Sequence, residues 1–311
     1  MNRTPPHDAF GRRSFLIAAT ALPLLAACGS GSSTAPLVEP GIDSTALDTR
    51  IAELERRYTA RIGLSVTRPS DDARYSHRAD EPFAHCSTFK VYAVAALLRS
   101  VAVGRHSLDN RVPIDPARVV ANSPVTAKAA GSTMTLRDLS FAALTQSDNT
   151  AANCLLDAIG GPAAITAFAR SVGDTTTRGD RMETELNTAI PGDPRDTSTP
   201  AGLAAGFRET LLGSGLAPAD RRQLQDWMRA SLTSAARIRA GLPPGWTSAD
   251  KTGSGDYGTV NDAGLIWNPA GDAMVLAILT TSTAGRPDVT ADGAIVADVT
   301  KAVTAAFDAG R

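Results

Sequence analysis

The sequence has few of the side chains that bind metals in proteins. It contains four histidines and three cysteines in 311 residues. His7, His77, His85 and His106 form no HExxH motif, and the cysteines form no CxxC pair. Zinc sites need three or four such ligands at close spacing. The sequence therefore predicts no metal site, and nothing in it indicates an organic cofactor.

An excess of basic charge is also missing. The chain carries 31 Lys and Arg against 32 Asp and Glu, a formal net charge of −1. A nucleic-acid-binding protein needs surplus cationic side chains on one face, because it displaces counterions from phosphates. No nucleic acid partner is therefore expected. Hydrophobic residues make up 43% of the chain, which argues against disorder and suffices for one large domain or two.

An apolar run at residues 15–27 is shorter than the roughly 20 residues that a transmembrane helix needs. It follows the twin arginine Arg12-Arg13. A basic segment before a short apolar run is typical of export signals. The pattern at residues 12–16 resembles twin-arginine signals, which carry folded proteins. The alternative is the basic segment of a general export signal.

The end of this run, LAACG at residues 25–29, resembles a bacterial lipoprotein cleavage box. The resemblance implies that residues 1–28 are a signal and that Cys28 becomes the lipid-bearing first residue. The protein would then be exported and anchored on the outer side of the cytoplasmic membrane or in the periplasm. The alternative is cleavage at a small-residue site, which gives a soluble, secreted product. Residues 29–41, rich in Ser, Gly, Thr and Pro, are interpreted as a flexible tether.

Strand patterns occur near both ends of the remaining chain. Apolar residues at helical spacing predict a helix after Ser44 and another over residues 295–307. Ile62, Leu64 and Val66 alternate with other residues and predict a half-buried strand. Three further strands are expected around residues 249–252, 259–267 and 273–281.

The middle of the chain is almost entirely helical in pattern, from residue 84 to residue 230. Thr135 with Asp138 forms a possible capping box, and Thr199 before Pro200 is a second helix start. The order predicts an α+β fold of two domains. The α/β domain comprises residues 42–82 and 231–311, and the inserted all-helical domain comprises residues 83–230.

Lysine is scarce, and its positions are therefore informative. It occurs only at Lys90, Lys128, Lys251 and Lys301, so that 27 of the 31 basic residues are arginine. Ser87 and Lys90 open a buried helical pattern and share one helix face. A serine at a helix start lies near the positive end of the helix dipole, and a buried lysine can accept its proton. Arginine is unable to act as that base.

Two further short motifs are weak by themselves. Ser147-Asp148-Asn149 follows a helical run and is an ordinary turn composition. Lys251-Thr252-Gly253 lies on an expected strand, where it is compatible with an edge strand entering a turn. Together and in this order, S-x-x-K, S-D-N and K-T-G form the combination found in class A β-lactamases and penicillin-binding proteins.

The mature chain resembles class A serine β-lactamases from about residue 43 to its end. Residues 181–187, RMETELN, match the family's R-x-E-x-x-L-N loop motif, which penicillin-binding proteins lack. The resemblance implies an antiparallel five-stranded sheet flanked by helices, formed by both termini, with a catalytic loop at residues 178–196. Arg181 and Asp196 match the ion pair that holds this loop.

The resemblance also implies residue roles. Ser87 is the nucleophile, Ser147 protonates the departing nitrogen, and Glu183 with Asn187 activates the deacylating water. The acylation base, Lys90 or Glu183, stays open. The main-chain N–H groups of Ser87 and Ser254 form the oxyanion hole. The residues expected to bind the substrate are Asn149, Asn187, Lys251, Thr252, Gly253, Ser254 and Arg237.

Three positions depart from common family patterns. Val260 stands where many members carry a carboxylate-binding arginine, and Arg237 matches the alternative position for that arginine. Asn122 replaces an aromatic residue at the edge of the site. Cys86 matches the first cysteine of a bridge seen in carbapenem-hydrolysing members, but Gly255 stands at the second position. Weak or absent carbapenem hydrolysis is therefore expected.

Residues 251–259, KTGSGDYGT, resemble members that hydrolyse oxyimino-cephalosporins. We therefore expect turnover of penicillins and cephalosporins, and inhibition by β-lactamase inhibitors such as clavulanate. No oligomerisation signal is present, so a monomer is expected. Cys86 and Cys154 are expected to be buried free thiols, with a disulfide as the alternative.

Two rival functions share the first three motifs. A penicillin-binding D,D-peptidase acts on cell-wall peptides, and a β-lactam sensor acylates without turnover. The loop at Glu183 counts against the peptidase, and the lack of an expected membrane span after Cys28 counts against the sensor.

Overall fold

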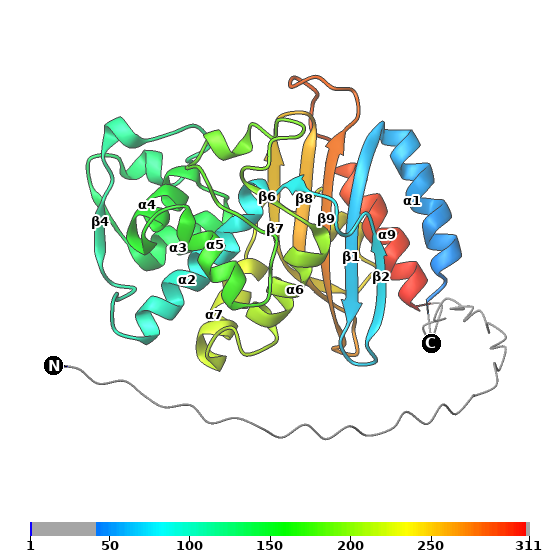
Figure 1. Cartoon of the computed structure of the whole chain (residues 1–311), viewed down its shortest axis with the longest axis horizontal. Coiled ribbons are helices and arrows are strands. Elements are labelled where there is room, and N and C mark those ends of the chain that lie inside the picture. Colours follow the sequence, from blue (N-terminus) through cyan, green and yellow to red (C-terminus); the bar gives the residue numbers. More distant parts are fainter. Residues whose placement is uncertain (2–41, 309–311) are drawn as a thin grey trace. The chain divides into compact units, whose positions relative to one another are not determined.

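A five-stranded antiparallel sheet lies at the centre of the described structure (Figure 1). The computed structural model describes Met1 and residues 42–308. The strand order is β2-β1-β9-β8-β7, so segments from the two ends of the chain meet in one sheet. This confirms the expected sheet. The strands are β1 (Ala60–Arg68), β2 (Ala73–His77), β7 (Thr247–Gly255), β8 (Thr259–Trp267) and β9 (Ala273–Ser282).

The apolar pattern explains the register of the strands. In β1, Ile62, Leu64 and Val66 are buried, as their alternation predicts. Leu64 pairs with Ile278 of β9, so apolar side chains of neighbouring strands share a face. A shift of one residue would turn these side chains to the opposite face. β8 and β9 are buried along most of their length, because helices cover both faces of the sheet.

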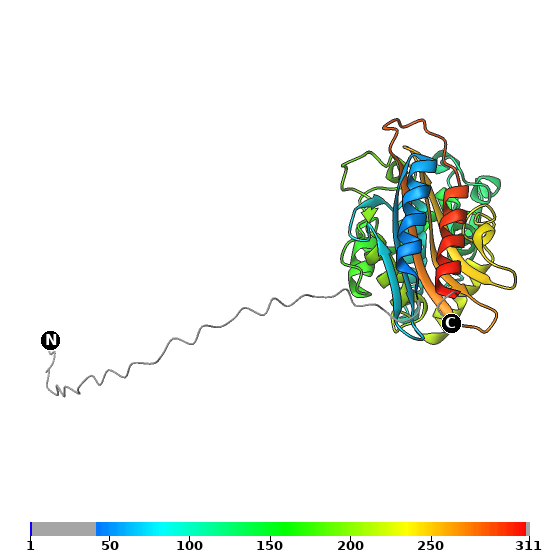
Figure 2. The same ribbon diagram turned by 90° about the vertical axis from the view of Figure 1, so that its right-hand side faces the viewer.

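Two long helices cover one face of the sheet. Figure 2 shows α1 (Ser44–Tyr58) and α9 (Ala294–Asp308) side by side on this face, and the short helix α8 (Ile238–Gly241) packs against α9. The helix predicted after Ser44 includes that residue, because the side chain of Asp43 accepts the N–H of Ala46 and caps the helix. One cluster of buried apolar side chains lies between these helices and the sheet.

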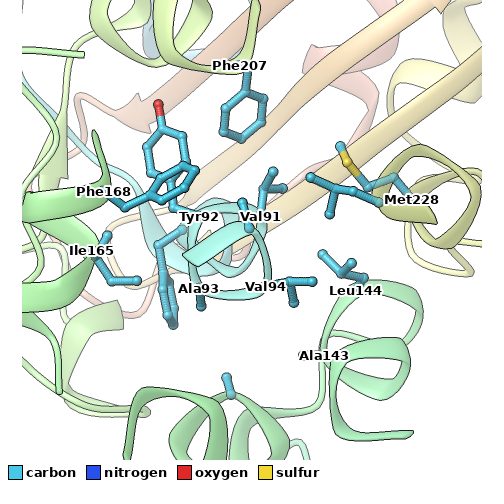
Figure 3. Close-up of a cluster of buried hydrophobic side chains, with 14 of the residues drawn as sticks. Val91, Tyr92, Ala93, Val94, Ala143, Leu144, Ile165, Phe168, Phe207 and Met228 are labelled. Atoms are coloured by element: carbon cyan, nitrogen blue, oxygen red, sulfur yellow. The ribbon is translucent and has the colours of Figure 1, made fainter. Parts of the chain in front are cut away.

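A layer of helices covers the other face around the buried helix α2 (Lys90–Ala102). In Figure 3, Tyr92 of α2 lies beside Phe168 and Phe207, and Val94 faces Leu144. This second cluster continues onto the inner face of the sheet. The surrounding helices are α3 (Leu136–Thr145), α4 (Asn149–Ile159), α5 (Ala163–Ser171), α6 (Pro200–Leu211) and α7 (Pro218–Arg229).

The predicted helix starts are confirmed, whereas several short strands were not predicted. Thr135 caps α3 by accepting the N–H of Asp138, and Thr199 caps α6. The helical region also contains two small ladders, whose strands are only two or three residues long and have no periodicity to read. These pairs are β3 (Phe83–Ala84) with β6 (Thr197–Ser198), and β4 (Arg111–Pro113) with β5 (Thr133–Thr135). The edge strand β2 was also missed.

Residues 42–308 fall within one compact unit. The proposed division into an α/β part and an inserted helical part stays a prediction. Over these residues, no single helix has the length and apolar composition to cross a membrane. Only α4 and α5 taken together, across a 73° bend, meet that criterion, and both contribute side chains to the helical core.

Candidate active site

Ser87 lies in a short 3₁₀ turn, η1 (Cys86–Phe89), which leads directly into α2. Asn261 of β8 fixes the chain before this turn by donating to the carbonyls of Ala84 (2.8 Å) and His85 (3.2 Å). Ser87 is 7% exposed, and its Oγ donates to Glu183 Oε1 at 3.2 Å. A hydroxyl donating to a carboxylate is the arrangement of an activated nucleophile.

Lys90 occupies the start of α2 and has no exposed side-chain surface. Its Nζ lies 2.9 Å from Glu183 Oε1, the oxygen that also accepts from Ser87. Burial lowers the pKa of Lys90, and the Glu183 carboxylate opposes this shift. Lys90 thus reaches Ser87 through Glu183, and among the described residues no hydrogen bond joins the two directly. Its remaining acceptors are Asn149 Oδ1 (2.7 Å), the carbonyl of Ser147 (2.8 Å) and Ser147 Oγ (3.4 Å).

Ser147 lies in the turn between α3 and α4, with a positive φ of 55°. Its Oγ accepts a hydrogen bond from Lys251 Nζ at 3.0 Å and lies 3.4 Å from Lys90 Nζ. Burial, and the nearby Lys90, hold the pKa of Lys251 well below its ordinary value. A hydroxyl between two such amines is suited to pass a proton to a leaving group.

Asp148 holds the turn that carries Ser147. It is fully buried and caps α4 through the N–H of Ala151. It also accepts from the N–H groups of Val125 and Thr126. The middle residue of the Ser-Asp-Asn motif is therefore structural, while Ser147 and Asn149 face the lysines.

The loop at residues 178–196 brings Glu183 to the nucleophile. Asn187 Nδ2 donates to Glu183 Oε2 at 2.5 Å. Arg181 Nε donates to Asp196 Oδ2 at 2.6 Å, and Asp196 Oδ1 accepts the N–H of Arg181. The ion pair closes the loop at its base, so that Glu183 is held from both directions.

The edge strand β7 forms the opposite side of the site. Gly253 permits a close approach, because a Cβ there would lie 2.9 Å from the carbonyl oxygen of His85. Arg237, the residue before α8, donates to the Gly253 carbonyl (2.7 Å) and to Ser254 Oγ (2.6 Å). Thr252 Oγ1 lies 2.7 Å from Thr233 Oγ1. The hydroxyls of Thr252 and Ser254 thus lie beside the guanidinium of Arg237, a combination suited to binding a carboxylate.

The positions that depart from the family pattern are also located. Val260 is buried in the core beneath α8 and α9. Asn122 is exposed, with a φ of 56°, and its carbonyl accepts the N–H of Asn149. A Cβ at Gly255 would lie 2.8 Å from Cys86 Sγ, so positions 86 and 255 face each other.

Both described cysteines are free thiols. Cys86 is buried as predicted, and burial raises its pKa. Cys154 is only half-buried, which corrects the prediction, because its position on α4 lies at the margin of the helical core. Cys28 lies outside the described residues. Residues 42–308 contain no cluster of three or more His, Cys, Asp or Glu side chains that would bind a metal ion.

Sequence reasoning missed two residues that support the site. Asn153 Oδ1 accepts the N–H of Glu183 at 2.8 Å, and its Nδ2 donates to the Glu183 carbonyl at 2.9 Å. The ring nitrogens of His85 lie 2.9 Å from the Cys86 carbonyl and 3.0 Å from the Arg178 carbonyl. Asn153 follows Asn149 by one helical turn, and that spacing was the only available signal.

Comparison with protein families identifies the "Beta-lactamase enzyme family" over residues 46–307. Beta-lactamase AST-1 of Nocardia asteroides is 46% identical, across 94% of this chain and 93% of that protein. Beta-lactamase Toho-1 of Escherichia coli is 42% identical, across 95% and 98%.

Solved structures agree with the sequence comparison. A β-lactamase from Desulfarculus baarsii superposes with a TM-score of 0.82 at 44% identity, covering 85% of this chain and 98% of that one. A class A β-lactamase described as the last common ancestor of Gram-negative bacteria gives a TM-score of 0.81 at 49% identity, covering 84% of this chain and 99% of that one.

Proposed function

The chain belongs to the class A β-lactamase family and hydrolyses β-lactams, which confers resistance to them, and we propose that Ser87 carries the acyl group. The observation that supports this assignment is the convergence of Ser87 Oγ and Lys90 Nζ on one oxygen of Glu183. A serine, a buried amine and a carboxylate in one chain of contacts supply a nucleophile and two possible bases.

Acylation forms a bond between Ser87 Oγ and the lactam carbonyl carbon. The hydroxyl proton leaves to Glu183, its direct acceptor, or through it to Lys90, and the negative oxygen is held by main-chain N–H groups of Ser87 and Ser254. An individual oxyanion donor contributes roughly 3 kcal/mol to transition-state stabilisation. The carbon–nitrogen bond then breaks, and Ser147, hydrogen-bonded to Lys251, gives its proton to the nitrogen. The proton taken from Ser87 passes through Lys90 to Ser147, which restores the Ser147 hydroxyl and leaves Glu183 ionised.

Deacylation uses a water molecule held by Glu183 and Asn187. Glu183 takes one proton from this water while its oxygen attacks the ester carbon. The Ser87 oxygen leaves and takes up this proton from Glu183, which restores the hydroxyl and the carboxylate. The 2.5 Å contact between Asn187 Nδ2 and Glu183 Oε2 supports this role.

A burst experiment tests the assignment. Purified protein lacking residues 1–28 is mixed with a hundredfold excess of benzylpenicillin, beside a Glu183→Ala variant. Wild type should consume the whole excess, whereas the variant should stop near one equivalent with a penicilloyl adduct on Ser87. If the variant turns over like wild type, Glu183 is not the deacylation base.

Arg237 is assigned to the substrate's carboxylate, together with Thr252 and Ser254. Its hydrogen bond to Ser254 Oγ supports this. Among the described residues it donates to no carboxylate, so its charge is available to a ligand. Arg237→Ala should raise the Michaelis constant for benzylpenicillin, and an unchanged constant would remove Arg237 from the site.

The substrates are proposed to be penicillins and cephalosporins, with clavulanate as an inhibitor and weak or no carbapenem hydrolysis. The sequence of β7 and its turn supports the cephalosporin assignment, and the free Cys86 accords with the carbapenem one. Absorbance assays with benzylpenicillin, cefotaxime and imipenem at one enzyme concentration rank the three classes. Survival of cefotaxime at concentrations that clear benzylpenicillin would contradict the assignment.

Export through a twin-arginine signal and lipidation at Cys28 are proposed from the sequence of residues 12–28. Radiolabelled palmitate should label the wild-type chain in a bacterial host and leave Cys28→Ser unlabelled. The mature protein is proposed to be a monomer. Light scattering on the purified protein lacking residues 1–28 checks this state.

A further inference from the structure

Two buried carboxyl groups lie on the face of the sheet that α8 and α9 cover. Asp250 of β7 and Asp262 of β8 have no exposed surface. Asp250 pairs with Gly264, and Asp262 pairs with Thr252. The two aspartates are therefore diagonal neighbours on one face of the sheet. Neither takes part in the reaction steps described above.

Asp262 holds the segment that carries Arg237. Its Oδ2 accepts the hydroxyl of Ser234 at 3.0 Å and the N–H of Ile238 at 3.3 Å. These residues stand on either side of Arg237 in the sequence, and the N–H of Arg237 donates to the Ser234 carbonyl at 2.9 Å. One buried oxygen thus binds residues on both sides of Arg237, Ser234 through its hydroxyl and Ile238 through its N–H.

An acidic side chain at position 262 is unfavourable for the stability of the fold. Oδ1 of Asp262 and Oδ2 of Asp250 have no hydrogen-bond partner among the described residues. Burial, and the neighbouring Asp250, raise the pKa of Asp262 well above its usual range. A buried, incompletely bonded carboxyl group destabilises a fold relative to a neutral residue of the same shape. Such a cost is typical of positions that serve function.

We propose that Asp262 is the positioning residue for Arg237, and that it keeps the guanidinium where the carboxylate of the substrate binds. The proposal rests on the carboxylate-binding role of Arg237 proposed above. It requires an oxygen acceptor at this position and not a negative charge, because the two bonds that fix the segment come from neutral donors. Asparagine should therefore replace aspartate, whereas alanine should not.

Three variants separate this role from a merely structural one. Asp262→Ala should raise KM for benzylpenicillin about tenfold with kcat within about twofold, the loss expected for about 1.4 kcal/mol of binding. Asp262→Asn should restore KM and melt at or above the wild-type temperature, because it keeps the oxygen acceptor and removes the buried ionisable group. Asp250→Ala is the matched control, and should lower the melting temperature while KM stays unchanged.

A double variant shows whether Asp262 acts through Arg237. In an Arg237→Ala background, Asp262→Ala should not raise KM further. Both single variants should leave kcat/KM unchanged for benzylpenicillin methyl ester, which lacks the carboxylate. An additional rise in KM in the double variant, or a KM in Asp262→Asn equal to that of Asp262→Ala, would overturn the proposal.

The outcome for Arg237→Ala alone distinguishes this proposal from the earlier one. If that variant keeps the wild-type KM, the carboxylate-binding role of Arg237 fails. If it raises KM while Asp262→Ala does not, only the positioning role fails.

Should Asp262→Ala not fold, Ser234→Ala removes one of the two donors and should raise KM about threefold with kcat unchanged. An unchanged KM in that variant would also overturn the proposal.

Discussion

Asn153 should control the deacylation step without touching the substrate. Its side chain makes two hydrogen bonds to the main chain of Glu183, at 2.8 and 2.9 Å. Asn153→Ala leaves this N–H and this carbonyl without partners in a residue that is 4% exposed. Each buried unsatisfied group costs about 1–3 kcal/mol, so we expect a loss of about 2–6 kcal/mol in the free energy of unfolding. At about 2 °C per kcal/mol for a chain of this size, the melting temperature should fall by about 4–12 °C.

The same substitution should slow hydrolysis of the acyl-enzyme more than its formation. A misplaced general base loses up to about 10²–10⁴ in rate, whereas Lys90 remains available to support acylation. Stopped-flow measurements with benzylpenicillin should therefore show a rapid burst of one equivalent followed by slow turnover. Asn268→Ala, a substitution outside the site, serves as control. A variant that melts within about 1 °C of wild type and shows no burst would refute the reasoning.

Three further changes test other contacts. Arg181→Ala leaves the buried Asp196 carboxylate without its cation. The free energy of unfolding, measured with urea, should fall by about 3 kcal/mol. An unchanged urea midpoint would show that the ion pair does not hold the loop. The pKa of Lys251 is lowered in the folded protein, so the unfolded chain binds more protons just below pH 10.5. Wild type should therefore gain stability as pH rises towards that value, and Lys251→Met should gain less. Gly255→Ala places a Cβ 2.5 Å from the Asn187 carbonyl oxygen, and should lower kcat for penicillins; wild-type kcat would mean that the loop shifts freely.

The strongest sequence predictions concerned long, periodic elements and short motifs. The alternation of Ile62, Leu64 and Val66 predicted β1, and the caps at Thr135 and Thr199 predicted the starts of two helices. The edge strand β2 was missed because only Ala73 and Tyr75 of its five residues are buried. A strand with little apolar surface gives a weak periodic signal.

The site residues were predicted from the order of the motifs along the chain. The contacts that support these residues depend on the three-dimensional fold. Three motifs and a loop motif identified the family without any geometry. No local pattern, however, indicates that Asn153 binds the main chain of Glu183, or that Asp262 binds the segment around Arg237. These contacts join residues 30 and 28 positions apart, respectively, through hydrogen bonds.

The sequence by itself determined the fold class and the reaction family, and it predicted the reacting side chains, because the residues of each motif lie within a few positions of one another along the chain. Only the tertiary structure decided their partners. Ser87 and Glu183 are 96 positions apart, and Lys251 and Ser147 are 104 apart. Hydrogen bonds act over about 3 Å and depend on direction, so which groups share a proton follows from how α2, β7 and the loop pack together.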